Sequence, residues 1–168
     1  MPDLRLKQLY PRVNEWWTEQ YGWPLWCDPE PEDRYVFRQV HVCLDENQTE
    51  FDQQNGLLTK LIVDFLNEPK ITENLKTGKP PIGGLNRLQL LLTERGFAEA
   101  KRQLEPLRIV QQLRSTGAAH GKGTNYEKTL KRSGLEGLSL IDRSLKVFHG
   151  AVNFVQWVQT KVLKIAVQ

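Results

Sequence analysis

One arginine and one histidine in this chain have the types and the spacing for chemistry on a phosphate. Arg114 and His120 lie in the stretch LRSTGAAHGKGTNYEKTLKR, residues 113–132. An arginine is permanently charged and can grip a phosphate through two parallel hydrogen bonds. A histidine side chain titrates near pH ~6.5, so it can take or give a proton at neutral pH. The pair is a minimal set for cleaving RNA without a metal: the base takes the 2′-hydroxyl proton, the freed oxygen attacks the phosphorus, and the arginine stabilises the charge.

Helix geometry sets a condition on this chemistry. Six residues of a straight helix turn through about 600°, so Arg114 and His120 would lie about 120° apart. They can act on one phosphate only if the helix breaks between them, for which Gly117 is suited, or if a second copy completes the site across a two-fold axis. Small residues would let an RNA backbone approach closely: Gly117, Ala118, Ala119, Gly121 and Gly123. The expected contacts to phosphate are Ser115, Lys122, Asn125 and Lys128.

Two other interpretations of this stretch stay open. In the first, it is an ordinary connection between helices, in which Arg114 and His120 bind helix-terminal carbonyls and water and the lysines are solvated. In the second, it belongs to a non-catalytic helical module that binds nucleic acid or a protein partner. The other two histidines, His41 and His149, are expected to be structural.

Charge is distributed unevenly along the chain. Residues 28–52 contain eight acidic residues and two arginines, a formal charge of −6. Residues 100–134 contain eight basic residues and two glutamates, a formal charge of +6. A local positive field of this kind favours phosphates or an acidic partner surface. The alternative is that the two segments neutralise each other in the folded protein.

The remaining composition narrows the class of protein. A chain of 168 residues suits one domain with its own core. No window approaches the ~20 apolar residues of a membrane span, and no signal peptide is apparent, so we expect a cytoplasmic protein without a membrane partner. The two cysteines, Cys27 and Cys43, form neither a disulfide framework nor a zinc pattern, even with His41 nearby. We therefore expect no metal and no cofactor.

Hydrophobic periodicity predicts mostly helices. Capping boxes are expected at Asp45 and Thr124, and Pro106 is expected to restart a helix in its first turn. Segment 35–44 is rich in β-branched and aromatic residues and predicts a short strand. The predicted helices span 3–20, 45–67, 85–96, 97–119, 124–133 and 136–163.

The predicted fold class is therefore all-α: a helical bundle at residues 45–168 with a less regular, tryptophan-rich appendage at residues 1–44, the whole forming one compact unit. Four tryptophans crowd the appendage, and they predict either a small local core or a recognition surface for a partner. They are Trp16, Trp17, Trp23 and Trp26.

Arg-x5-His at the end of a bundle helix resembles the HEPN superfamily, whose hallmark is Arg-x(4–6)-His. The longer stretch 113–132 also looks like one in uncharacterised bacterial proteins, with a shared LRS-G-AH-KG-NYEK pattern. The resemblance implies a small all-α bundle, a metal-independent endoribonuclease and a composite site formed by two motifs in a dimer or larger complex. It also implies a role in toxin or anti-phage defence systems, with Arg114 and His120 as the catalytic pair and RNA as the partner.

Overall fold

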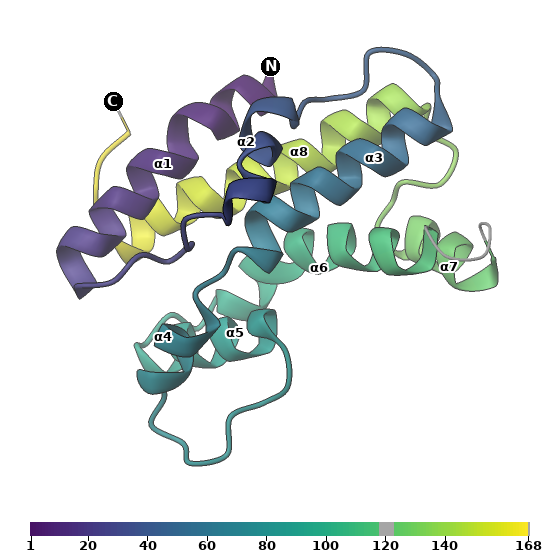
Figure 1. Ribbon diagram of the computed structural model, residues 1–168. Helices are drawn as coiled ribbons and strands as arrows, with labels where there is room; N and C mark the ends of the chain where they lie inside the picture. Colours follow the sequence, from purple (N-terminus) through teal and green to yellow (C-terminus); the bar gives the residue numbers. More distant parts are fainter. Residues whose placement is uncertain (118–122, 168) are drawn as a thin grey trace.

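The computed structural model describes residues 1–117 and 123–167, and over these ranges the chain is all-α. Figure 1 shows the helices, coloured in their order along the chain. The only pairing of extended chain described is an isolated bridge between Trp26 and Leu66. The main helices are α1 (Pro2–Tyr21), α2 (Tyr35–Gln39), α3 (Gln48–Thr59), α4 (Glu68–Glu73), α5 (Gly84–Glu94), α6 (Ala100–Gly117), α7 (Thr124–Arg132) and α8 (Leu140–Trp157). A short 3-10 helix, η1 (Pro31–Asp33), precedes α2, and two π-helices extend α3 and α8: η2 (Lys60–Asp64) and η3 (Val158–Val162).

The bundle is built around α8, which packs against α1, α3 and α6. Figure 1 shows α1 and α3 alongside α8, with α6 crossing below them and α4 and α5 forming a small pair at one end. Buried apolar side chains from all these main elements form one continuous core. The predicted all-α helical bundle is therefore confirmed.

The N-terminal segment, expected as an appendage, contributes to this same core. Leu6, Val13 and Trp17 on α1 are fully buried, because the apolar stripe of that helix faces α8. Trp23 and Trp26 are buried as well, and the indole nitrogen of Trp26 donates a hydrogen bond to the carbonyl of Ile62 at 3.2 Å. Burial of three of the four tryptophans removes the interpretation of this corner as an exposed recognition surface.

Helices α6 and α8 approach each other closely where Pro106 faces Gly150. A Cβ atom on Gly150 would lie 2.8 Å from the Cβ of Pro106, so only glycine allows this crossing. The predicted restart of a helix at Pro106 is wrong, because α6 continues unbroken from Ala100 through this residue. The ring removes one backbone hydrogen bond from α6, and its packing against α8 compensates.

Several predicted boundaries also differ from the structure. The predicted strand over residues 35–44 is wrong: residues 35–39 form α2, and Val40 and Val42 are buried in extended chain that has no partner strand among the described residues. The cap of α3 is Asn47 rather than Asp45, since the Asn47 side chain accepts from two backbone amides of the first turn. At α7 the N-cap position is Gly123, so the predicted Thr124 box is also wrong.

Candidate functional site

The candidate site lies where α6 ends and α7 begins. Arg114 is in the last turn of α6, and the helix is described as far as Gly117, the residue expected to break it. His120 and Lys122, both predicted site residues, fall in the segment 118–122 and lie outside the described residues. The structure therefore gives the surroundings of Arg114 and the start of α7.

Arg114 makes a bidentate salt bridge to a residue that the sequence analysis did not single out. One terminal nitrogen of the guanidinium donates to Oδ2 of Asp64 at 2.5 Å, and the other donates to Oδ1 at 2.9 Å. About a third of each side chain is exposed, 34% for Arg114 and 37% for Asp64. Such a fork-to-carboxylate pair fixes the plane and direction of the guanidinium as well as its position. The pair joins residues 50 positions apart, so no local motif could have revealed it.

A π-helical turn helps place Asp64 beside α6. The backbone amide of Phe65 donates to the carbonyl of Lys60 at 3.1 Å, an i to i+5 bond that widens the turn ending at Asp64. Earlier in α3, the Asn55 side chain donates to the carbonyl of Val110 at 3.0 Å, and the Thr59 hydroxyl, which donates to the Asn55 carbonyl at 2.7 Å, also lies 3.2 Å from that of Val110. These buried bonds hold α3 on α6 at the crossing, and η2 then brings the Asp64 carboxylate to Arg114.

The salt bridge has two opposite effects on phosphate binding. The carboxylate offsets the positive charge that would attract a phosphate, and it uses one N–H of each terminal nitrogen. It also keeps the remaining N–H groups of Arg114 in a fixed orientation at the surface, which lowers the entropy lost when they meet a ligand. Asp64 therefore affects both the net charge around the Arg114 guanidinium and its orientation.

The other predicted contacts are partly available to a ligand. Ser115 is exposed, but its hydroxyl donates to the carbonyl of Gln112 at 3.1 Å and so turns back on its own helix. Asn125 and Lys128 are exposed on α7. Arg132 donates to the side chain of Gln112, which ties α7 to α6. The structure thus places Arg114 at the end of α6 and the exposed Asn125 and Lys128 on α7, the helix that follows the junction.

The backbone at the start of α7 also suits an anion. Gly123 occupies the N-cap position, and no side chain of a described residue caps the helix there. The amides of the first turn and the positive end of the helix dipole favour negative charge. The same helix carries basic residues in its last turn, Lys131 and Arg132.

The acidic segment 28–52 and the basic segment 100–134 keep their charges largely apart. With Asp52 set aside, no acidic residue of the first segment forms an ion pair with a described residue of the second. The described partners lie elsewhere: Asp33 pairs with Lys60, and Glu50 lies 3.9 Å from His41. Among these residues, the two segments therefore do not neutralise each other through ion pairs.

The two described histidines do not join this site. His41 is held in its place by the Gln54 side chain, which accepts from the His41 backbone amide at 2.8 Å and contacts the ring at 2.9 Å. His149 is exposed on α8. In the described ranges, no three His, Cys, Asp or Glu side chains are grouped as a metal ion would require.

None of the described helices combines the length and the apolar character needed to cross a membrane. No protein-family model, curated protein or solved structure matches the chain.

Proposed function

We propose that the α6–α7 junction binds RNA through its phosphates and cleaves it without a metal ion, as HEPN-like endoribonucleases do. Arg114 would stabilise the charge on the phosphoryl oxygens, and His120 would take the proton from the 2′-hydroxyl. Attack of that oxygen forms a new bond to the adjacent phosphorus and expels the 5′-oxygen of the next nucleotide, which takes a proton from water. The products are a 2′,3′-cyclic phosphate and a 5′-hydroxyl end.

The observation that carries this proposal is the held but surface-accessible guanidinium of Arg114 at the end of α6. Three features of its surroundings suit an RNA strand: the exposed Asn125 and Lys128, the amides at the start of α7, and the basic residues in the last turn of α7, Lys131 and Arg132. Ser115, Lys122, Asn125 and Lys128 would contact flanking phosphates.

The proposal extends to assembly and setting. Because Arg114 and His120 are six positions apart and would point about 120° apart on one straight helix, a second copy of the chain or a larger complex would bring together the two motifs of a composite site. Cleavage of cellular or invading RNA in the cytoplasm, as part of a toxin or anti-phage defence system, is the setting that this chemistry suits.

A second candidate function is a non-catalytic helical module that binds nucleic acid or a protein partner. The favouring observation is that both terminal nitrogens of Arg114 already bond Asp64. In this case the arginine serves to hold η2 on α6, and the positive charge of α7 alone attracts the partner.

The test incubates end-labelled RNA with the protein in excess EDTA. We expect cleavage by the unaltered chain, with cyclic phosphate ends. Arg114→Ala should slow cleavage about 100-fold or more, and His120→Ala should slow it by a similar factor. Arg102→Ala is the matched control, because Arg102 is a highly exposed arginine on the same helix, away from the junction.

A second measurement separates the two candidate functions. RNA affinity is measured as a function of salt for the same variants, because each phosphate contact adds about one to the salt slope. A chain that binds RNA with a steep slope but never cuts it is the non-catalytic module. Cleavage that survives Arg114→Ala and His120→Ala, or that requires a metal ion, contradicts the proposed mechanism.

A further inference from the structure

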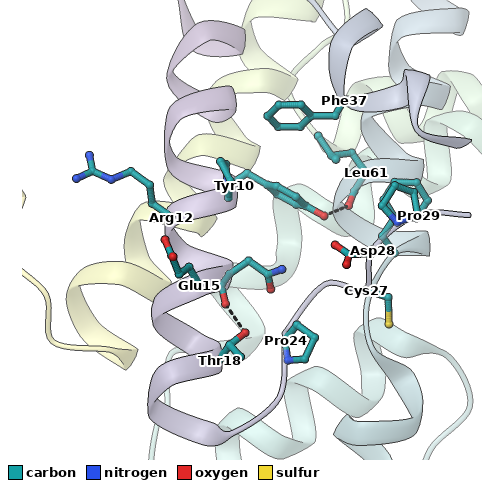
Figure 2. Close-up of a pocket in the computed structure, with 13 residues that line it drawn as sticks. Tyr10, Arg12, Glu15, Thr18, Pro24, Cys27, Asp28, Pro29, Phe37 and Leu61 are labelled. Atoms are coloured by element: carbon teal, nitrogen blue, oxygen red, sulfur yellow. Dashed lines mark hydrogen bonds between the residues drawn. The ribbon is translucent and has the colours of Figure 1, made fainter. Parts of the chain in front are cut away.

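A cavity of about 600 Å³ opens on the side of the molecule formed by α1, the segment 24–29, α2 and η2. Figure 2 shows it between the α1 helix and the chain that carries Asp28 and Pro29. Its volume lies within the range of small-molecule sites, which is roughly 300–1,000 Å³. None of its lining residues belongs to the α6–α7 junction, so the cavity is separate from the site of the proposed function.

The inner walls of this cavity are aromatic and aliphatic. They include the Tyr10 and Phe37 rings, whose centroids lie 6.1 Å apart, and the side chains of Leu61 and Phe65. The Tyr10 hydroxyl donates to the carbonyl of Leu61 at 3.1 Å, a bond drawn in Figure 2 that fixes the ring against the wall. The cavity therefore offers a preformed apolar surface to the body of a ligand.

The neutral hydrogen-bonding side chains of the lining are already engaged with the backbone. Tyr10 donates to Leu61 as described, and the Thr18 hydroxyl donates to the carbonyl of Asn14 at 2.8 Å. The Asn14 amide bonds Trp26 at both ends, since its nitrogen donates to the Trp26 carbonyl and its oxygen accepts from the Trp26 amide, each at 2.9 Å. These groups shape the cavity and leave few donors for an anionic or acceptor-rich ligand.

The free polar groups of the lining are carboxylates. Glu15 and Asp28 are exposed, and neither has a hydrogen-bond or ion-pair partner among the described residues. Figure 2 shows Asp28 across the cavity from α1, whereas the Glu15 carboxylate lies on the Arg12 side of α1. Arg12, the one cation of the lining, has its guanidinium over the Trp16 ring at 5.3 Å.

The charge of Asp28 reaches the interior of the cavity. Burial raises the pKa of the Tyr10 hydroxyl well above its usual value, and the negative charges of Cys27 and Asp28 add to the rise. Burial also raises the pKa of the Cys27 thiol, again with a contribution from Asp28. Burial, the larger cause of both shifts, disfavours a charge of either sign, and only the smaller contribution of Asp28 favours a cation at this place.

We propose that this cavity binds a small organic ammonium ion with an aromatic or aliphatic body. The ammonium donates to Asp28, with the negative charge of Glu15 adding to the attraction, and the body packs against the Tyr10 and Phe37 rings. An uncharged or anionic molecule of the same shape gains the apolar contact but lacks the carboxylate partner.

The test titrates the full chain with 2-phenylethylammonium and follows backbone amide signals by NMR. We expect saturable shifts confined to residues 10–18, 24–29, 37 and 61–65, with half-saturation at roughly 1 mM. Two probes of the same shape serve as controls, 2-phenylethanol and 3-phenylpropionate, and both should bind about tenfold more weakly. Equal binding of the three probes, shifts that spread over other surfaces, or no saturation by about 10 mM amine would each overturn the proposal.

Substitutions then test the carboxylates themselves. Asp28→Asn and Glu15→Gln should each weaken amine binding about threefold, and the double variant about tenfold, because exposed charge pairs are weak individually. Glu30→Gln is the matched control: it removes one charge from the same acidic segment but lies outside the lining. If Glu30→Gln weakens binding as much as Asp28→Asn, the attraction comes from net charge and the proposed site is wrong.

Discussion

Replacing Gly150 by alanine tests the crossing that positions α6, the helix that carries Arg114. The new Cβ would lie 2.8 Å from the Cβ of Pro106, closer than carbon atoms in neighbouring side chains approach. The proline ring cannot rotate aside, so α6 or α8 must shift. Gly56 in α3 is the matched control, because a Cβ there meets no atom of the described residues within 4 Å.

The magnitude follows from two opposing terms. Alanine is favoured over glycine inside a helix by roughly 1 kcal/mol, and both substitutions gain this. Overpacking a well-packed contact costs about 1–3 kcal/mol, which only Gly150→Ala incurs. We expect Gly56→Ala to raise the free energy of unfolding by up to about 1 kcal/mol. Gly150→Ala should lower it by about 1 kcal/mol, so the two variants differ by about 2 kcal/mol.

Urea denaturation followed by circular dichroism measures both free energies. In thermal unfolding the same difference should separate the two melting temperatures by roughly 4–8 °C for a chain of this length. Equal stabilisation by the two alanines would refute the reasoning, because it would mean that Pro106 and Gly150 are not in contact. The arrangement of α6 on α8, and with it the placement of the α6–α7 junction, would then be wrong.

Two further outcomes are expected. A double-mutant cycle of Asp64→Asn with Arg114→Ala should give a coupling of about 0.5 kcal/mol in the free energy of unfolding. The coupling is small because about a third of each side chain is exposed. No coupling would mean that the salt bridge does not form in solution. Hydrogen bonds from the Leu140 and Ile141 amides lower the pKa of Glu46. The stabilisation that the Glu46 carboxylate contributes is therefore complete above the ordinary carboxyl pKa of about 4.3 and is lost as the pH falls through the lowered value. When the urea concentration at the unfolding midpoint is measured against pH, it should fall less in acid for Glu46→Gln than for the unaltered chain.

Local pattern was enough for the fold class and for most helices. The apolar repeats of α1, α5 and α8 appear in the structure as buried faces, because a 3.6-residue period places such residues on one side. Errors arose where tertiary contacts outweighed local signals. Pro106 sits inside a helix because its ring packs against Gly150, and Val40 and Val42 are buried without a strand because they cover the core.

At the candidate site too, some features were predictable from the sequence and others depend on tertiary contacts. Residue types and spacing alone singled out Arg114, Asn125 and Lys128 at the junction of two helices, and the junction is where the structure places them. Ser115 was chosen by type, yet its hydroxyl bonds the preceding turn. The pairing of Arg114 with Asp64 was not predictable, since it depends on the π-helical turn of η2 and on the crossing of α3 with α6.

The sequence by itself determined that this is a helical protein with a basic segment around an arginine and a histidine. Those properties depend on periodicity and composition, which act over a few residues. Only the tertiary structure decided that Asp64 holds Arg114, and that α1, the segment 24–29 and η2 form an open cavity whose lining includes two carboxylates. Contacts between residues 50 positions apart depend on how the faces of whole helices pack against each other, and a short stretch of sequence does not contain that information.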